Sequence, residues 1–480
     1  MGDRLAERAA FWWLLLPIVF GLLLRALRRP AFFHRYVGEA TPASLAAIRV
    51  LTCAILLAHV MVEDLASTAW LPRRLVEPMG VLQLLYALPI GFRGFLASPA
   101  ALSVFKAVTA ALLLAGAAGW RARATLPLAA LGYLIFGGIL RQYSAFYHAG
   151  LVPLYVLAVL VFTPCVDAWS IDRRRRASRG LPVPEPGRPA AVYGWSRYAC
   201  WTVVALAYAA SGLSKLRNGG LHWWDAANVR AIYYRTSLNP MHFDWGLSLR
   251  LVQAPDALFA LLGLASVALE VGFLAVLFWR PARRVLPLLM ILFHVAVLFL
   301  ENLLFLDLVV LQAIFFDFAE PGGLLGPGRA AGEPRPPAGQ GGLRHPALVA
   351  AAASVVVCAW ITRIEFYPLT AMQMFSWRDR SGVVEYYKVL AQRRSGAVDP
   401  AALRHCTYRT FAITPVVKKA FDPAGQAICR EYLAMCAARG NRRAADPIAR
   451  FEIQRWRWDL RHDRAGEHVT LVDRYVQDVP

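Results

Sequence analysis

Residues 284–318 read RVLPLLMILFHVAVLFLENLLFLDLVVLQAIFFDF, an apolar run with few polar interruptions. A helix rises ~1.5 Å per residue, and roughly 20 apolar residues cross the hydrocarbon of a bilayer. The run is therefore too long for one crossing. Because the polar pair Glu301-Asn302 lies near its centre, we expect a tight hairpin of two membrane helices, 284–301 and 303–318.

The rest of the chain has the same character. Of its 480 residues, 58% are hydrophobic and only 17% are charged. Soluble domains are nearer to half apolar and a quarter charged. We therefore expect an all-α polytopic membrane protein with about ten transmembrane helices. The predicted spans are 11–27, 44–62, 101–119, 124–140, 146–166, 194–213, 257–279, 284–301, 303–318 and 346–362.

The net charge of +21 comes almost entirely from arginine, and many of these arginines lie in short loops between spans. The densest loops are WRARA (120–124), DRRRRASR (172–179) and RPARR (280–284). Such loops face the cytoplasm, whereas scattered loop arginine is not the concentrated footprint of a nucleic-acid-binding surface. We expect an integral protein of the plasma (inner) membrane. Because ten is an even number of spans, both termini then lie on the outer side of that membrane. Arginines follow the first apolar run, so we interpret it as a span and not as a cleaved signal.

The composition changes after residue 362. The segment FEIQRWRWDL (451–460) alternates like a strand, and DPAGQAICREYLAMCAARG (422–440) is typical of a helix ending at Gly440. We expect a small mixed α/β extracytoplasmic domain. The predicted organisation is an extra N-terminal helix (1–39), a transmembrane domain (40–320), a Gly/Pro-rich cytoplasmic linker (321–345), a final helix (346–362) and the C-terminal domain (363–480).

The seven cysteines fall into two groups. Four lie in or near apolar spans and are interpreted as packing residues. The other three, Cys406, Cys429 and Cys436, lie in the polar tail, where one disulfide would form in an oxidising compartment. The spacing of cysteine and histidine matches no metal site.

Four ionisable residues lie inside predicted spans: Arg49, His59, Glu270 and His294. Such residues are costly in a membrane and face the interior of the bundle. Counting residues from the span ends places Arg49 and Glu270 at depths that permit an ion pair, and a structural pair that pins two helices is the favoured interpretation. For His294, a packing role and a site role stay equally open.

A second set of polar residues lies at the predicted outer ends of three spans. His148, Lys215 and Glu301 would bring an imidazole, an amine and a carboxylate to one interfacial pocket. Burial of an amine favours its neutral form, which is the form a general base needs. The alternative for Lys215 is snorkelling toward the headgroups. Trp223 and Trp224 are likewise typical of an aromatic belt at the interface.

Four segments together resemble the HTTM (horizontally transferred transmembrane) domain, which vitamin K-dependent gamma-carboxylase shares with many bacterial proteins. The resemblance covers roughly residues 40–320 and includes an aligned histidine, a W-S-x-D end and a G-x-x-K-L segment. The segments are RQYSAFYHAGLVPLYVLAVLVFTPCVDAWSIDRRRR (141–176), ALAYAASGLSKLRNGGLHWWD (205–225), LEVGFLAVLF (269–278) and FHVAVLFLENLLFLDLVVL (293–311).

The resemblance implies a carboxylase-like pocket. By similarity, Lys215 would be the base that starts oxygenation of vitamin K hydroquinone or another quinol, and His148 would act around the glutamate carbanion. His294, Glu301, Trp224, Arg49 and Glu270 would line or support the site. The implied partners are membrane lipid and a secreted protein or peptide substrate. The chain departs from the carboxylase in having Ser214-Lys215 in place of two adjacent lysines, and in its shorter tail.

Three functions follow from these observations. The first is quinol-linked chemistry at the outer membrane face, of a carboxylase or oxidoreductase type. The second is a non-enzymatic membrane factor for export, maturation or immunity of a secreted partner, with function carried by the tail. The third is a transporter, which would require inverted repeats with broken helices; no internal repeat is evident.

Overall fold

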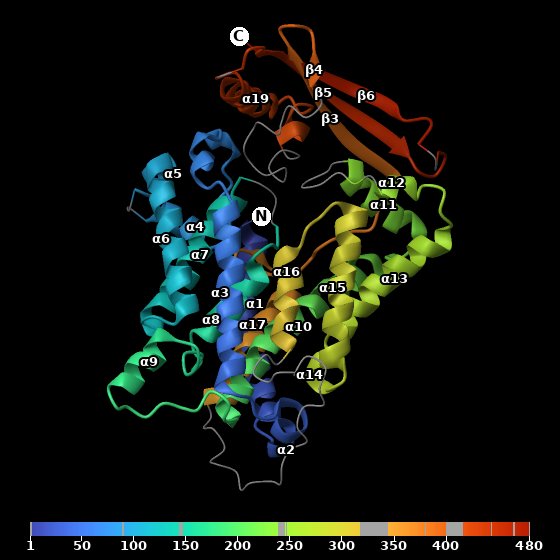
Figure 1. Cartoon of the computed structure of the whole chain (residues 1–480). Coiled ribbons are helices and arrows are strands. Elements are labelled where there is room, and N and C mark those ends of the chain that lie inside the picture. Colours follow the sequence, from blue (N-terminus) through green and yellow to red (C-terminus); the bar gives the residue numbers. More distant parts are fainter. Residues whose placement is uncertain are drawn as a thin grey trace.

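The structure is a computed structural model. It describes residues 2–88, 91–143, 147–238, 245, 247–316, 344–379, 381–399, 416–442, 444–463 and 466–479. The predicted linker 321–345 lies almost entirely outside these residues. Figure 1 shows a helical bundle with the C-terminal sheet lying across one end of it. We call the end nearest the sheet the tail end.

Seven helices in the described residues are long and apolar enough to cross a membrane, and an eighth is added if the bent pair Phe11–Leu27 and Pro30–Val37 counts as one span. Several carry exposed apolar side chains, such as Val104 on α6 and Leu292 on α15, as lipid-facing helices do. The seven are α3 (Pro42–Val62), α6 (Pro99–Ala118), α7 (Ala122–Arg141), α10 (Ala191–Gly219) continuing to His222, α13 (Asp256–Gly272) continuing through α14 (Ala275–Phe278), α15 (Ala282–Glu301) and α17 (Arg344–Thr362).

Two predicted spans are shorter than expected. Span 146–166 contains only α8 (Leu151–Leu160), and span 303–318 contains only α16 (Leu306–Leu311) with the 3₁₀ turn η5 (Gln312–Phe315). Pro164 follows α8, and the residue before a proline is disfavoured in helical conformation. The predicted break is confirmed, because α15 ends at Glu301 and Asn302 adopts a left-handed conformation with φ of 56°.

Apart from α1, which contributes Phe11–Leu27 to the bent pair, the remaining helices are short. The segment 81–92, which is short and apolar, forms α4 and the start of α5 and no full span. The full set of these remaining helices is α1 (Gly2–Leu27), α2 (Pro30–Phe32), η1 (Phe33–Val37), η2 (Ala66–Trp70), η3 (Arg73–Leu75), α4 (Leu82–Ala87), α5 (Phe92–Leu96), α9 (Ile171–Ser178), η4 (Gly220–His222), α11 (Ala226–Leu238) and α12 (Leu247–Arg250).

The first and last long helices pack together. α17 lies against both α1 and α10. Near the start of the apolar part of α1, Trp12 Nε1 donates to Thr362 Oγ1 at the end of α17, at 2.8 Å. The apolar part of α1 therefore begins beside the end of α17.

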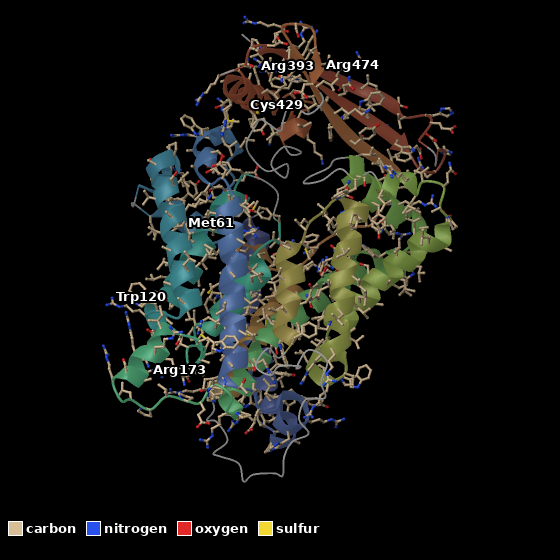
Figure 2. The ribbon with its side chains drawn as sticks, in the orientation of Figure 1. Met61, Trp120, Arg173, Arg393, Cys429 and Arg474 are labelled. Carbon is tan, nitrogen blue, oxygen red and sulfur yellow. The ribbon has the colours of Figure 1, made fainter. Side chains whose placement is uncertain are left out.

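The arginine-rich loops 120–124 and 172–179 lie at the end of the bundle opposite to the tail (Figure 2). Figure 2 labels Trp120 and Arg173 at the end opposite to Arg393 and Arg474, which belong to the tail. The arginine-rich helix α9 lies at that opposite end. The predicted cytoplasmic loops 120–124 and 172–179 are thus neighbours: the Asp172 carboxylate accepts the backbone N–H groups of Arg121 and Ala122, each at 2.8 Å.

The tail forms a four-stranded antiparallel sheet in the order β4-β3-β5-β6, with α19 (Gln426–Gly440) packed on it. The predicted strand and the predicted helix end at Gly440 are confirmed. Cys436 forms a disulfide, whereas Cys429 is free. The strands are β3 (Val383–Arg393), β4 (Val398–Asp399), β5 (Ile448–Asp459) and β6 (Thr470–Asp478).

The tail is not an independent appendage. Trp458 of β5 stacks on Tyr234 of α11, with ring centroids 5.0 Å apart. Before the sheet, a small hairpin of β1 (Glu365–Phe366) and β2 (Leu369–Thr370) enters the tail end of the bundle. Tyr367 is fully buried there, and its hydroxyl donates to the carbonyl of Leu134 on α7 at 2.7 Å.

Candidate functional site

Three helices direct polar side chains toward one another near the tail end. On each helix these residues are spaced three, four or seven positions apart, so they share one face. They are Tyr208, Ser211 and Lys215 on α10, Ser266 and Glu270 on α13, and His294 and Glu301 on α15.

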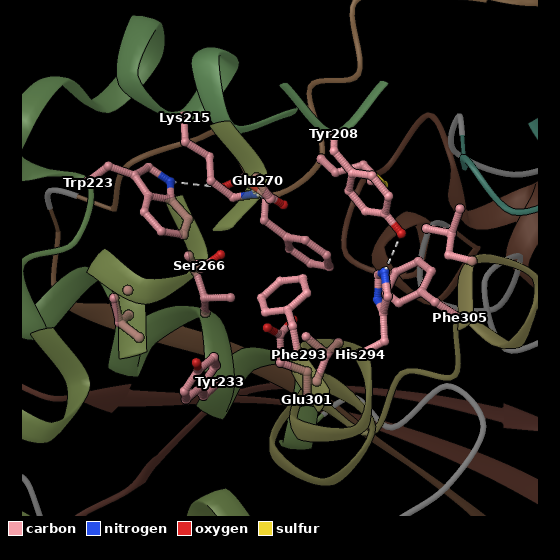
Figure 3. Close-up of a pocket in the computed structure, with 17 residues that line it drawn as sticks. Tyr208, Lys215, Trp223, Tyr233, Ser266, Glu270, Phe293, His294, Glu301 and Phe305 are labelled. Carbon is pink, nitrogen blue, oxygen red and sulfur yellow. Dashed lines mark hydrogen bonds and ion pairs between the residues drawn. The ribbon is translucent and has the colours of Figure 1, made fainter. Parts of the chain in front are cut away.

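Lys215 and Glu270 form a buried ion pair (Figure 3). The amine Nζ lies 2.6 Å from Oε1 and 2.5 Å from Oε2 of the carboxylate. Ser211 Oγ donates to Oε1 at 3.2 Å and accepts a bond from the lysine amine at 3.3 Å. Lys215 is 2% exposed and Glu270 is 4% exposed, so water barely screens this pair.

The direction of the lysine decides between the two interpretations of its position. Side chains on a helix lean toward its N-terminus, and the N-terminus of α10 is at the opposite end of the bundle. Lys215 therefore reaches into the bundle and not out to the surface. The snorkelling interpretation is excluded by its burial and by its pairing with Glu270.

Trp223 covers the lysine. Its ring centroid lies 5.3 Å from the amine, and its Nε1 donates to the carbonyl of Phe375 at 2.9 Å. Trp223 is 4% exposed. Trp224, the residue predicted to support the site, is only partly buried and packs beside this cluster without lining the pocket. Trp223 therefore has the role predicted for Trp224, and it is not a belt residue.

A second hydrogen-bonded group contains His294. Tyr208 Oη lies 2.8 Å from His294 Nε2 and also accepts a bond from Gln312 Nε2 at 2.8 Å. Among the described residues, His294 Nδ1 has no hydrogen-bond partner. His294 thus combines the two roles left open by the sequence, because one nitrogen is held in the core and the other is unsatisfied in a residue that lines the pocket.

Glu301 brings a second carboxylate to the same pocket. It is 7% exposed, and its Oε2 has no hydrogen-bond partner among the described residues. A buried polar atom left without a partner costs about 1–3 kcal/mol. Unsatisfied atoms on both Glu301 and His294 indicate a place where a polar ligand could bind.

The walls of the pocket are aromatic and the floor is polar. Including its open mouth, the pocket holds about 610 Å³ of empty space, but the centres of water-sized molecules reach only about 50 Å³. The smaller value governs what fits without movement, namely a few waters at roughly 10–15 Å³ each. A larger ligand must displace side chains. The aromatic residues that line the pocket are Tyr208, Trp223, Tyr233, Phe293, Phe305 and Phe375.

Residues 371–377, which follow β2, close one side of the pocket; we call them the strap. Met374 and Phe375 line the pocket directly. Ser214, the neighbour of the lysine, donates to the carbonyl of Ala371 at 3.1 Å. Asn218 donates to Ser376 Oγ at 2.9 Å. The first part of the tail is therefore part of the site.

His148 does not line this pocket. Its Nε2 lies 3.1 Å from Thr370 Oγ1, and Thr370 in turn donates to Glu365 Oε2 at 2.7 Å. The expectation of one pocket shared by His148, Lys215 and Glu301 is thus wrong for the histidine. Instead, His148 hydrogen-bonds to Thr370, the residue just before the strap. Ser214 hydrogen-bonds to Ala371, the first residue of the strap.

The expected ion pair between Arg49 and Glu270 is also wrong. Arg49 is fully buried and donates to backbone carbonyls of Cys165, Ala168, Ala117 and Trp169. It fixes the W-S-x-D segment to α6, in a purely structural role. Depth alone could not assign the partner of Glu270, because the long lysine side chain reaches several ångströms along the bundle.

No family model matches this chain, and no match was found among curated proteins or solved structures. The resemblance to the HTTM domain therefore rests on the quoted segments alone.

Sequence reasoning missed Tyr208, Ser211, Trp223 and the strap. A signal for the first two existed, because Tyr208 and Ser211 precede Lys215 by seven and four residues on an otherwise apolar helix. The strap has no such signal, since its Met374 and Phe375 reach the pocket only through the tertiary fold.

Proposed function

We propose that this chain is an HTTM-type membrane enzyme whose pocket around Lys215 accepts the head group of a lipid-borne hydroquinone. Bound there, the hydroquinone would supply the reducing chemistry. The observation that carries the proposal is the buried Lys215–Glu270 pair, placed among aromatic side chains and two unsatisfied polar atoms. The substrate modified with this chemistry would be a secreted protein or peptide.

The pair provides a route for a proton. In a water-poor pocket, the proton of the ammonium can move across the 2.5 Å contact to the Glu270 carboxylate, leaving a neutral amine. That amine can take the phenolic proton of a bound hydroquinone and so generate the reactive quinolate. Ser211, bonded to both groups, keeps the geometry fixed during the transfer.

The residues present suit a planar phenolic ring. Trp223, Phe293 and Phe375 offer flat apolar faces, while Glu301 Oε2 and His294 Nδ1 can bond to ring hydroxyls. Ligand pockets commonly hold roughly 300–1,000 Å³. The pocket as it stands, at about 50 Å³, is smaller than that range. Entry of the ring would require Met374 and Phe375 to move aside.

We place the tail end of the bundle outside the plasma membrane, with both termini there. Two observations support this orientation. The arginine-rich loops lie at the opposite end, as cytoplasmic loops do. Cys436 in the tail forms a disulfide, which is typical of an oxidising compartment.

The alternative is a non-enzymatic factor that binds a secreted partner through its tail. The observation in its favour is β6, an edge strand of nine residues on which Val476 is half exposed. An open edge strand can pair with an extended peptide. Under this alternative, the pocket residues would matter only for folding.

Turnover of a hydroquinone separates the two functions. The purified protein in nanodiscs is given a naphthohydroquinone with an isoprenoid tail in air, and products are followed by mass spectrometry. The test variant is Lys215→Met/Glu270→Gln, which removes both charges together and so leaves no buried unpaired charge. We expect its turnover to fall by about 100-fold or more, the usual contribution of a positioned acid–base group.

The matched control is Lys106→Met. Lys106 is a half-buried lysine of α6, and it donates to the carbonyl of Glu63, just after α3, at 2.6 Å and away from the pocket. The Lys106→Met substitution should leave turnover of the hydroquinone unchanged. The enzymatic proposal fails if wild type turns over no faster than empty nanodiscs, or if the double variant is as fast as wild type.

A further inference from the structure

A second pocket lies at the tail end of the bundle and shares no lining residue with the Lys215 pocket. It is formed by the segments that join α3 to α6, together with Tyr143 just after α7. The centres of water-sized molecules reach about 310 Å³ of it, against about 50 Å³ around Lys215. It therefore holds a ligand larger than a few waters without rearrangement.

Two tyrosines line the pocket, and a buried glutamine holds one of them. Tyr86 Oη donates to Gln142 Oε1 at 2.9 Å, and Gln142 is fully buried. Tyr143, the sequence neighbour of Gln142, is itself only 5% exposed. The phenol of Tyr86 is thus held at a pocket whose other walls include the apolar side chains of Leu71 and Leu96.

Arg73 and Arg93 bring two positive charges to the same pocket. Within the part of the chain that the structure describes, neither arginine forms an ion pair, although exposed arginines of the tail such as Arg450 and Arg461 do. Arg93 lies over the ring of Tyr86 at 6.0 Å from its centroid. Guanidinium groups bind phosphate and carboxylate in a fork geometry, and apolar walls strengthen such bonds.

The surroundings indicate what kind of anion binds. Trp70, Leu84 and Leu88 next to the pocket are at least half exposed, and α4 is a short helix that does not cross the bundle. An exposed tryptophan beside apolar side chains at the end of membrane helices is typical of the headgroup level. A ligand at this depth has a polar head and an apolar tail.

We infer that this pocket binds the phosphate of an anionic membrane lipid. Arg73 and Arg93 contact the phosphate, Tyr86 and Tyr143 contact the rest of the head group, and the acyl chains leave past the exposed leucines of α4. The site does not depend on the chemistry proposed at Lys215. The same phosphate chemistry could belong to a soluble phosphate ester, which the test below distinguishes.

The test uses native mass spectrometry of the full-length protein with phosphatidylglycerol, phosphatidylcholine or soluble glycerol phosphate. Wild type should retain phosphatidylglycerol in preference to phosphatidylcholine. The variant Arg73→Gln/Arg93→Gln should lose that preference, with affinity falling roughly tenfold or more for each arginine. Arg74→Gln is the matched control, because Arg74 is an exposed neighbour in η3 that does not line the pocket.

A charge-preserving variant protects the test against misfolding. Arg73→Lys/Arg93→Lys keeps both charges and should retain part of the lipid preference. The inference is overturned if the Gln/Gln variant keeps the preference of wild type, if Arg74→Gln loses it equally, or if glycerol phosphate competes away the lipid. That last outcome would assign the pocket to a soluble anion.

Discussion

At the scale of single residues, the site depends on where two long side chains reach. Lys215 leans into the bundle and meets Glu270, while Arg49 turns to backbone carbonyls near the W-S-x-D segment. The sequence identifies Arg49 and Glu270 as unusual residues within spans, and Lys215 as a polar residue at the end of one. It cannot assign their partners, because depth along a helix fixes the Cα position and leaves the direction of the side chain open.

The ion pair makes a prediction about stability. Lys215→Met or Glu270→Gln alone leaves one buried charge unpaired, which costs about 3–5 kcal/mol. The double variant should lower the free energy of unfolding by clearly less than the sum of the two single variants. A double-mutant cycle measured by denaturation in detergent tests this coupling.

The control cycle uses Arg457 and Glu385, which form an exposed pair at 3.1 Å in the tail sheet. Its coupling should be far smaller, since water screens it. If the effects of Lys215→Met and Glu270→Gln on the free energy of unfolding simply add, so that their coupling is as small as that of the exposed pair, the buried ion pair is contradicted.

At the scale of elements, apolar runs predict helices well and their lengths poorly. The long helices and the hairpin at Glu301-Asn302 follow from hydropathy. The short helices α8 and α16 do not, because apolar residues continue where the helix has ended. The backbone N–H of Gly150, next to α8, donates to Asp307 of α16 at 2.7 Å, a contact between distant segments that no local pattern contains.

The strap provides a prediction at this scale. Trp223→Phe keeps the aromatic cover of Lys215 but removes the bond from its Nε1 to the carbonyl of Phe375. Losing one such bond should raise amide hydrogen exchange in peptides covering 371–379 by about fivefold. Trp224→Phe is the control, since Trp224 lies outside the pocket lining. Equal exchange in both variants would show that Trp223 does not hold the strap.

At the scale of the whole molecule, the helical bundle and the tail pack into one structural unit. Met374 and Phe375 line the pocket, and Trp458 stacks on Tyr234. Removing residues 363–480 would therefore damage the Lys215 pocket along with the tail, and could not separate an enzymatic role from a binding role. Point substitutions in the pocket are the sharper tool.

We propose that the Lys215 pocket holds a quinol head group. The most direct measurement is the mass spectrum of lipids extracted from the purified protein. We predict a quinone that co-purifies with wild type and with Lys106→Met, and that is depleted in Lys215→Met/Glu270→Gln. Absence of any quinone from wild type, or equal amounts in wild type and the double variant, would contradict the claim.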